Sequence, residues 1–214
     1  MRKIRIVLIL ISIATIIIAG FYGVEYYRHH QPIPAGAVTL ELPLKNGTFY
    51  VTVSGQTRTM HTSVDQKYAL DIIRMPKISE WFRFRNTSLE ANSTYDTPVY
   101  SPCSGNIKKT FDGVADQPIG IASPENSVGN AIIMGCDGGF NVMMAHFKAG
   151  TIKVKTGDRV KVGDQIAQIG NSGNSGGPHL HIDAFRFGNS TSDVIPLPII
   201  FNGQYFLTGD SFKN

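Results

Sequence analysis

Two patterns of apolar residues divide this chain of 214 residues. Residues 6–24 carry no charged side chain and are almost wholly apolar, so they predict one helix. At about 1.5 Å of rise per residue, such a helix is long enough to cross a hydrocarbon core of about 30 Å. From Val38 onward, short apolar or alternating runs are separated by Gly, Asn, Asp and Pro, which is typical of strands. The sequence therefore predicts one N-terminal transmembrane helix followed by a mainly β domain.

The predicted strands are short, rich in β-branched or aromatic residues, and bounded by turn residues. They cover residues 38–42, 49–54, 68–73, 131–134 and 142–145. Asp137, Gly138 and Gly139 predict a hairpin between the last two. Residues 154–166 hold two Gly-Asp turns and predict a small, tightly turning sheet, whereas helical periodicity is weak and confined to residues 78–84. We expect antiparallel sheets packed in a β-sandwich-like arrangement.

The charges around the apolar stretch predict its orientation. Arg2, Lys3 and Arg5 precede it and Glu25 follows it, so the positive-inside rule leaves the N-terminus in the cytoplasm. We expect a single-pass membrane protein whose β domain lies on the periplasmic or extracellular side; secretion after signal cleavage is the alternative. The expected parts are a cytoplasmic tip and transmembrane anchor (1–24), a polar, Pro-containing tether (25–37) and an exported domain (38–214).

Net charge and cysteine content narrow the function classes. The formal net charge is +4, and three of the positive charges precede the predicted helix, so no basic stripe indicates nucleic-acid binding. Cys103 and Cys136 both lie in the exported part, where an oxidising compartment permits a disulfide. We therefore predict that these two cysteines pair.

The segment GNSGNSGGPHLH (residues 170–181) contains the first candidate site residues. A Gly-rich loop that leads into an apolar run predicts a turn followed by a strand, and residues two apart on a strand share a face. His179 and His181 therefore point the same way, with Leu180 on the opposite face. Two adjacent imidazoles can ligate a metal, or one can ligate while the other transfers protons. The alternative is a pair of surface histidines.

Asp71 lies within the apolar strand predicted at residues 68–73. An ionised carboxylate in such a strand needs a partner, because its desolvation costs several kcal/mol. An ion pair with Arg74 or Lys67 is one solution, and a metal ion is the other. With the histidines available, two imidazoles and one carboxylate, from His61, His181 and Asp71, make the ligand set of a catalytic zinc site with a fourth position for water.

Several segments together resemble the lysostaphin-type (beta-lytic) zinc endopeptidases, which cut the peptide part of bacterial peptidoglycan. The matching segments are TPVYSP (97–102), AHF (145–147), VKTGDRV (154–160), GDQI (163–166), GNSG (170–173) and PHLH (178–181). The resemblance implies that His181 and Asp71 ligate zinc and that His179 positions or deprotonates the attacking water. It also implies that His146 stabilises the oxyanion or orients the same water.

The chain departs from the family pattern at the first histidine ligand. Family members place this histidine four residues before the aspartate, where this chain has Lys67. We expect His61, ten residues before Asp71, to supply the imidazole from a longer loop. The alternative keeps the four-residue spacing by pairing His61 with Asp65. A second departure is the long segment 74–96, which holds Trp81 and Phe82 and is either a wall of the substrate groove or an insertion packed on the domain surface.

These observations lead to one expected function and two alternatives. We expect a zinc-dependent metalloendopeptidase, anchored to the membrane, that hydrolyses peptide cross-links or stems of peptidoglycan. The first alternative is a non-catalytic wall-binding regulator or activator of another wall hydrolase, with a protein partner that the sequence does not name. Such relatives lack several of the five site residues, and this chain retains all five. A biotinyl or lipoyl carrier domain is disfavoured because the Gly-Asp turns lack the Met-Lys hallmark.

Overall fold

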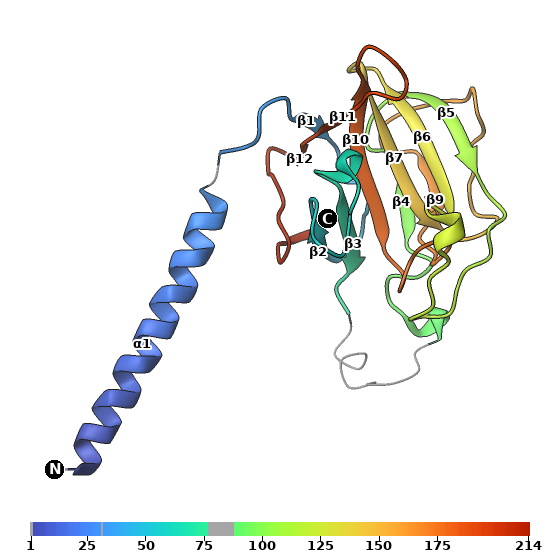
Figure 1. Cartoon of the computed structure of the whole chain (residues 1–214). Helices are drawn as coiled ribbons and strands as arrows, with labels where there is room; N and C mark the ends of the chain where they lie inside the picture. The colour runs from blue at the N-terminus through green and yellow to red at the C-terminus, as the bar shows by residue number, and fades with distance from the viewer. Residues whose placement is uncertain (1, 31, 77–87) are drawn as a thin grey trace. The chain divides into compact units, whose positions relative to one another are not determined.

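The computed structural model describes residues 2–30, 32–76 and 88–214 (Figure 1). The chain forms two compact units, Met1–Pro34 and Ala35–Asn214. The first contains one helix, α1 (Arg2–His29). Its window Leu10–Tyr27 is long and apolar enough to cross a membrane, by length and composition.

The second unit is built almost wholly from strands, which confirms the predicted mainly β, antiparallel fold. The strands are β1 (Val38–Leu40), β2 (Thr48–Ser54), β3 (Leu70–Arg74), β4 (Pro98–Tyr100), β5 (Gly105–Phe111), β6 (Asn130–Cys136), β7 (Phe140–Phe147), β8 (Arg159–Val160), β9 (Gln165–Gln168), β10 (Leu180–Phe187), β11 (Val194–Leu197), β12 (Ile199–Phe201) and β13 (Ser211–Lys213). Three short 3-10 helices complete the described elements: η1 (Val64–Gln66), η2 (Leu89–Ala91) and η3 (Pro124–Asn126).

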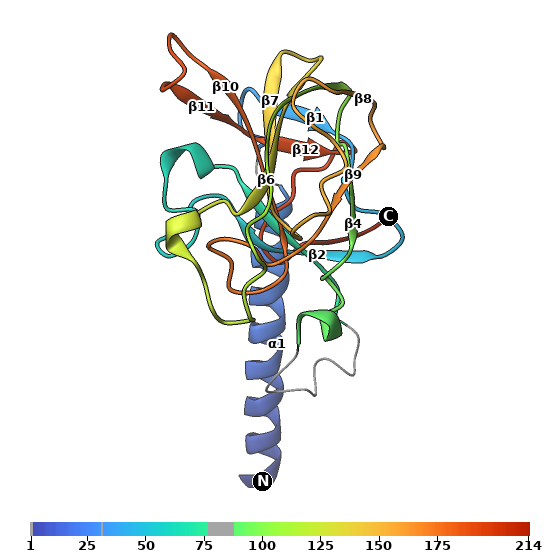
Figure 2. The same ribbon diagram turned by 90° about the vertical axis from the view of Figure 1, so that its right-hand side faces the viewer.

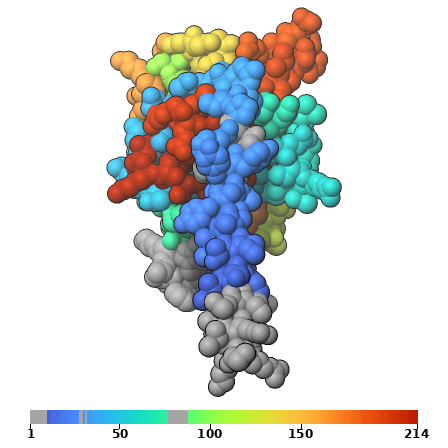
Figure 3. Space-filling view, turned by 90° about the vertical axis from the view of Figure 1, so that its left-hand side faces the viewer, coloured from blue at the N-terminus to red at the C-terminus, as the bar shows by residue number. Residues whose placement is uncertain are grey.

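One large sheet organises the domain. Its strands follow the order β13-β2-β3-β10-β7-β6-β5-β8, and β11 pairs with the end of β10. The predicted hairpin joins β6 to β7, with Gly139 donating to the carbonyl of Cys136. Segments from both ends of the domain meet, since β13 pairs with β2 and β1 pairs with β12. In Figure 3 the blue segment that begins near residue 38 lies beside the red C-terminal segment.

The apolar core lies between the large sheet and the two-stranded ribbon β4–β9 (Figure 2). Leu180 and Ile182 of β10 are fully buried in this core, together with Val99 of β4 and Ile166 of β9. Because side chains alternate across a strand, the odd-numbered residues of β10 face away from the core. The sheet therefore presents His181 and Asp183 on the face opposite its main apolar layer.

The two cysteines form a disulfide between the β4–β5 connection and the end of β6. Their Cα atoms lie 5.8 Å apart. Gly105 follows Cys103 closely and begins β5, where a Cβ would come within 2.1 Å of the carbonyl oxygen of Gly135. Glycine at this position therefore allows β5 to pair with β6 beside the disulfide.

Two sequence predictions fall on the part of the chain that is not described. The weak helical periodicity at residues 78–84 and the aromatic residues Trp81 and Phe82 lie outside the described residues. Of the proposed groove wall, the structure describes its two ends. At the N-terminal end Arg74 donates to the carbonyl of Asn46, and at the C-terminal end η2 precedes β4 in the chain.

Candidate active site

Register brings Asp71 and His181 together. On the antiparallel pair β3–β10, Asp71 stands directly opposite His181, and directly opposite residues on one face are near neighbours. The His181 Nδ1 lies 2.9 Å from the Asp71 Oδ1. Both side chains are buried, and the described side-chain nitrogens within 3.5 Å of the Asp71 carboxylate belong to histidines rather than to Lys67 or Arg74. The alternation of side chains along β3 and β10 is therefore sufficient to bring Asp71 and His181 together.

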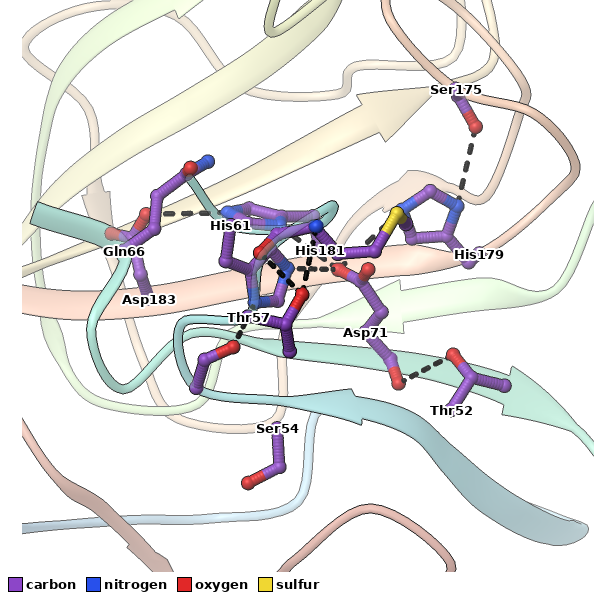
Figure 4. Close-up of polar contacts among 12 residues, drawn as sticks. Thr52, Ser54, Thr57, His61, Gln66, Asp71, Ser175, His179, His181 and Asp183 are labelled. Atoms are coloured by element: carbon purple, nitrogen blue, oxygen red, sulfur yellow. Dashed lines mark hydrogen bonds and ion pairs between the residues drawn. The ribbon is translucent and has the colours of Figure 1, made fainter. Parts of the chain in front are cut away.

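His61 reaches Asp71 because the β2–β3 connection folds back on itself (Figure 4). The backbone of Gly55 donates to the carbonyl of Ala69, which closes the loop at its base. At its far end the backbone turns sharply at His61, whose φ of 51° lies in the left-handed region. The turn carries the His61 Nε2 to 3.0 Å from the Asp71 Oδ1.

The structure thus separates the two carboxylates that the sequence offered. Asp71 is buried within the histidine cluster, whereas Asp65 is exposed on η1. Among the described residues, His61, Asp71 and His181 form the group of potential ligands, with one ligand atom each and all three atoms within 4.8 Å of one another. The ten-residue spacing between His61 and Asp71 is compatible with a shared site because the loop between them doubles back.

A bulge in β7 places His146. Phe147 pairs with Asn130 and Ala145 pairs with Ala131, so His146 is an extra residue between them. Its φ is 64°, and the histidine side chain is 6% exposed. The bulge rotates His146 out of the alternation of β7 and brings its ring centroid to 4.7 Å from that of His179. A bulge next to a site commonly re-aims a side chain in this way.

His179 lies immediately before β10 and completes the cluster. Its Nε2 is 3.5 Å from the Asp71 Oδ1, and its Nδ1 is 2.8 Å from the carbonyl oxygen of Gly177. The structure therefore brings together all five predicted residues, the ligand candidates His61, Asp71 and His181 and the two further histidines. Beside them lies a cavity of about 310 Å³, lined on one side by β2 and β3 and on the other by the loop 176–179.

Electrostatics at the site favour a cation. Burial alone would raise the pKa of Asp71, but hydrogen bonds to His181 and His61 outweigh it and hold that pKa well below its usual range. Burial alone would lower the pKa of His181, yet its hydrogen bonds to Asp183 and Asp71 raise it to about 10. The carboxylates of Asp71 and Asp183 therefore flank a position where positive charge is stabilised.

The other two histidines are neutral at physiological pH. Burial lowers the pKa of His146, and its neighbours His179 and His181 lower it further, to about 3, because a second positive charge beside them is unfavourable. Burial also lowers the pKa of His179, against the attraction of Asp71. Neutral imidazoles can accept a proton, so the site combines a cation-stabilising group with two proton acceptors.

The residues present fit a zinc ion. Nitrogen and carboxylate ligands bind zinc at about 2.0–2.2 Å, which places neighbouring donors of a tetrahedral site about 3.3 Å apart. The Asp71 Oδ1 lies at 3.0 Å and 2.9 Å from its two imidazole neighbours. The far nitrogen of each imidazole also has an acceptor, since His61 Nδ1 faces the carbonyl of Gly55 and His181 Nε2 faces Asp183. Ligating histidines normally have such partners, which fix the ring tautomer.

Asp183 was not identified from the sequence, although a signal for it was present. It lies two residues after His181 and shares its face of β10, in an otherwise apolar run. The reasoning that singled out Asp71, a carboxylate in an apolar strand, applies equally to Asp183. The carbonyl partners from Gly55, Ser172 and Gly177 carry no such signal, because main-chain atoms are the same in every residue.

Two imidazoles and a carboxylate beside two further histidines make up the donor set that is typical of mononuclear metal centres that activate water for hydrolysis. The sequence comparison then identifies the family. Residues 85–193 match the family model described as peptidase family M23, and the chain belongs to that family. His146, His179 and His181 lie inside the matched region, whereas His61 and Asp71 precede it. The unusual ten-residue spacing between His61 and Asp71 therefore lies outside the region that matches the family model.

Similar solved structures include three peptidases. Lysostaphin from Staphylococcus simulans is 26% identical with a TM-score of 0.40, and the alignment covers 72% of this chain and 47% of lysostaphin. The catalytic domain of EnpA, a prophage-encoded M23 protein from Enterococcus faecalis, is 19% identical with a TM-score of 0.46, covering 76% and 95%. Pseudoalterin, an M23 metalloprotease from the deep sea, is 16% identical with a TM-score of 0.48, covering 83% and 99%. No curated protein matches the chain.

This chain thus spans about half the length of lysostaphin. All three TM-scores fall below 0.5, so the family assignment depends on the family model and on the residues of the site.

Proposed function

We propose that this protein is a zinc-dependent endopeptidase that hydrolyses peptide bonds of bacterial peptidoglycan. The observation that carries the proposal is the convergence of His61, Asp71 and His181 beside two histidines with depressed pKa values. The membership in peptidase family M23 supports the reaction class. Peptidoglycan as substrate follows from the lysostaphin-type motifs around His146 and within the segment 170–181.

The ligands of the metal are assigned atom by atom. His61 would bind through Nε2, Asp71 through Oδ1 and His181 through Nδ1, because these are the atoms that converge. When bound there, zinc would lower the pKa of water towards neutrality and polarise the scissile carbonyl. Asp183 and the carbonyl of Gly55 hold the two rings by their remaining nitrogens.

His179 is the proposed general base. Its Nδ1 donates to the carbonyl of Gly177, which leaves the Nε2 lone pair facing Asp71 and the ligand cluster. This nitrogen can accept a proton from the attacking water and return it to the leaving amine. Such proton transfer contributes typically about 10²–10⁴-fold in rate.

His146 is proposed to orient the attacking water. Its Nδ1 donates to the carbonyl of Ser172, so the neutral ring presents an Nε2 lone pair rather than a proton. Stabilising an oxyanion would need an Nε2 proton and hence the imidazolium, which burial disfavours. Of the two roles that the family resemblance offered, water orientation fits this geometry better.

We also propose that the domain acts outside the cytoplasm. The helix α1 would anchor it to the membrane or serve as a signal sequence, with Arg2 and Lys3 on the cytoplasmic side. The disulfide between Cys103 and Cys136 supports an oxidising compartment.

The test incubates the zinc-loaded unit Ala35–Asn214 with purified peptidoglycan and identifies released fragments by mass spectrometry. New peptide ends that disappear in His181→Ala but persist in Ser190→Ala, an exposed residue beyond β10, would support the hydrolase and name the bond. Retained zinc without any release would instead favour the alternative of a wall-binding regulator.

A further inference from the structure

The loop between β9 and β10 contains two buried polar side chains, Asn171 and Ser175, that are hydrogen-bonded in series to His179. Figure 4 shows the contact between Ser175 and His179. Ser175 is 1% exposed, and its Oγ lies 3.2 Å from the His179 Nδ1. The same oxygen lies 2.7 Å from the Asn171 Oδ1 and 2.9 Å from the carbonyl oxygen of Gly177. Neither the metal ligands nor the water-activating groups include Ser175 or Asn171.

The direction of each hydrogen bond follows from the partners. The Asn171 Nδ2 donates to the carbonyl of Gln117, so the Oδ1 on the other side of that amide is an acceptor. The single hydroxyl proton of Ser175 must therefore go to Asn171 Oδ1 or to the Gly177 carbonyl, which both only accept. Either choice leaves an Oγ lone pair directed at His179.

His179 then has two acceptors at the same nitrogen. The Gly177 carbonyl and the Ser175 Oγ both face Nδ1, so this nitrogen carries the proton. In the other tautomer, the Nδ1 lone pair would lie 2.8 Å from a carbonyl oxygen with no proton between them. The arrangement holds the lone pair on Nε2, the atom that faces Asp71.

Hydrogen bonds to Asp116 hold the loop that contains Ser175, away from the proposed metal ligands. The backbone N–H of Asn171 donates to Asp116 Oδ1 at 2.6 Å, and the Tyr95 hydroxyl donates to Asp116 Oδ2 at 3.0 Å. Gly170 precedes Asn171, where a Cβ would come within 2.4 Å of both Asp116 Oδ1 and the backbone of Lys148. The loop is therefore packed too closely against Asp116 to shift freely.

We propose that Ser175, aligned by Asn171, is a positioning residue that fixes the tautomer and the ring orientation of His179. The inference rests on the proposed function, in which His179 accepts the proton of the attacking water. Groups that orient a histidine in this way through its second nitrogen commonly change activity by about 10–100-fold when they are removed. Hydrogen bonds thus connect Tyr95 through Asp116, Asn171 and Ser175 to the ring of His179.

The test compares Ser175→Ala and Ser175→Cys with Ser190→Ala in the full chain, purified in detergent and loaded with zinc. Cysteine has the same shape as serine with a slightly larger terminal atom, and it is only a weak hydrogen-bonding group. This second variant tests the proposal should the alanine variant fail to fold. Histidine ring nitrogen shifts measured by NMR report which nitrogen of His179 carries the proton. Hydrolysis of peptidoglycan is measured on the same samples.

We expect a single Nδ1–H tautomer of His179 in the unchanged chain and in Ser190→Ala. Ser175 also hydrogen-bonds the Gly177 carbonyl, so its replacement removes one acceptor at Nδ1 and releases the other. We therefore expect a mixture of tautomers in both Ser175 variants. The kcat should fall on the order of 10-fold with KM and zinc content unchanged. An unchanged tautomer together with unchanged kcat in the Ser175 variants would overturn the proposal, as would an Nε2–H tautomer in the unchanged chain. If no variant hydrolyses peptidoglycan, the proposed function fails, but the NMR result still decides whether Ser175 sets the tautomer.

Discussion

Replacing Asp71 by asparagine tests the ligand set most directly. The change removes one negative charge and keeps the shape of a buried side chain that contacts both His61 and His181. Asp65→Asn is the matched control, because this exposed carboxylate is the alternative ligand that the sequence spacing allowed. We expect zinc affinity to collapse in the first variant and to remain unchanged in the second.

The direction of the effect follows from the pKa of His181. Burial alone would lower this pKa, yet hydrogen bonds to Asp183 and Asp71 raise it to about 10, so this position stabilises positive charge. Removing one partner of a buried charge pair typically costs about 3–5 kcal/mol, which converts to a loss of about 10²–10⁴-fold in zinc affinity.

Zinc affinity of the unit Ala35–Asn214 would be measured by competition with a chromophoric chelator at pH 7.5, with circular dichroism to verify folding. A folded Asp71→Asn variant within about 10-fold of the unchanged affinity would refute the assignment of Asp71 as a ligand. A large loss in Asp65→Asn instead would restore the four-residue spacing typical of the family.

Three further predictions use the same unit. His179→Ala should retain zinc by chelator competition but lose about 10²–10⁴-fold in kcat on peptidoglycan, and loss of zinc would instead place His179 among the ligands. Because the pKa of His181 is raised to about 10, this histidine is protonated at pH 6 in the metal-free site. Zinc must therefore displace about one proton, and its affinity should increase as the pH rises. Calorimetry in buffers of different ionisation enthalpy counts that proton at pH 6, below the pKa of about 7 of zinc-bound water. Joint replacement of Cys103 and Cys136 by alanine removes a disulfide that joins residues 33 positions apart, so the free energy of unfolding should fall by about 4 kcal/mol. The Tm should fall by about 7–15 °C, and a decrease of less than about 3 °C would contradict the prediction.

The sequence was sufficient where side-chain direction follows from simple alternation. His179 and His181 share a face because they are two residues apart, and Leu180 between them enters the core. Asp71 could be singled out because a lone carboxylate in an apolar strand requires a partner. These inferences depend on the two-residue period of a strand, which sequence reports directly.

The sequence was insufficient where the backbone leaves that period. His61 and His146 both adopt positive φ, one in a loop that doubles back and the other in a β-bulge. Neither histidine is directly followed by glycine, the residue that usually marks such a turn in a sequence. Histidine itself tolerates the left-handed region better than most residues. Their approach to Asp71 and His179 is set by hydrogen bonds between distant segments, such as Gly55 with Ala69, which no local pattern encodes.

Some site residues lie on regular strands and others on irregular backbone, and this difference matters for the proposed mechanism. The proposed ligand pair Asp71 and His181 is held by ladder hydrogen bonds of a sheet that also encloses the core, so its geometry is as rigid as the fold. The proposed roles of His146 and His179 fall on a bulge and on the end of a loop, where main-chain carbonyls of Ser172 and Gly177 can reach the rings. A strand interior could not offer those carbonyls, because the ladder already uses them. A site that needs both rigidly held metal ligands and histidines with a defined tautomer is therefore best placed where the sheet ends and the loops begin.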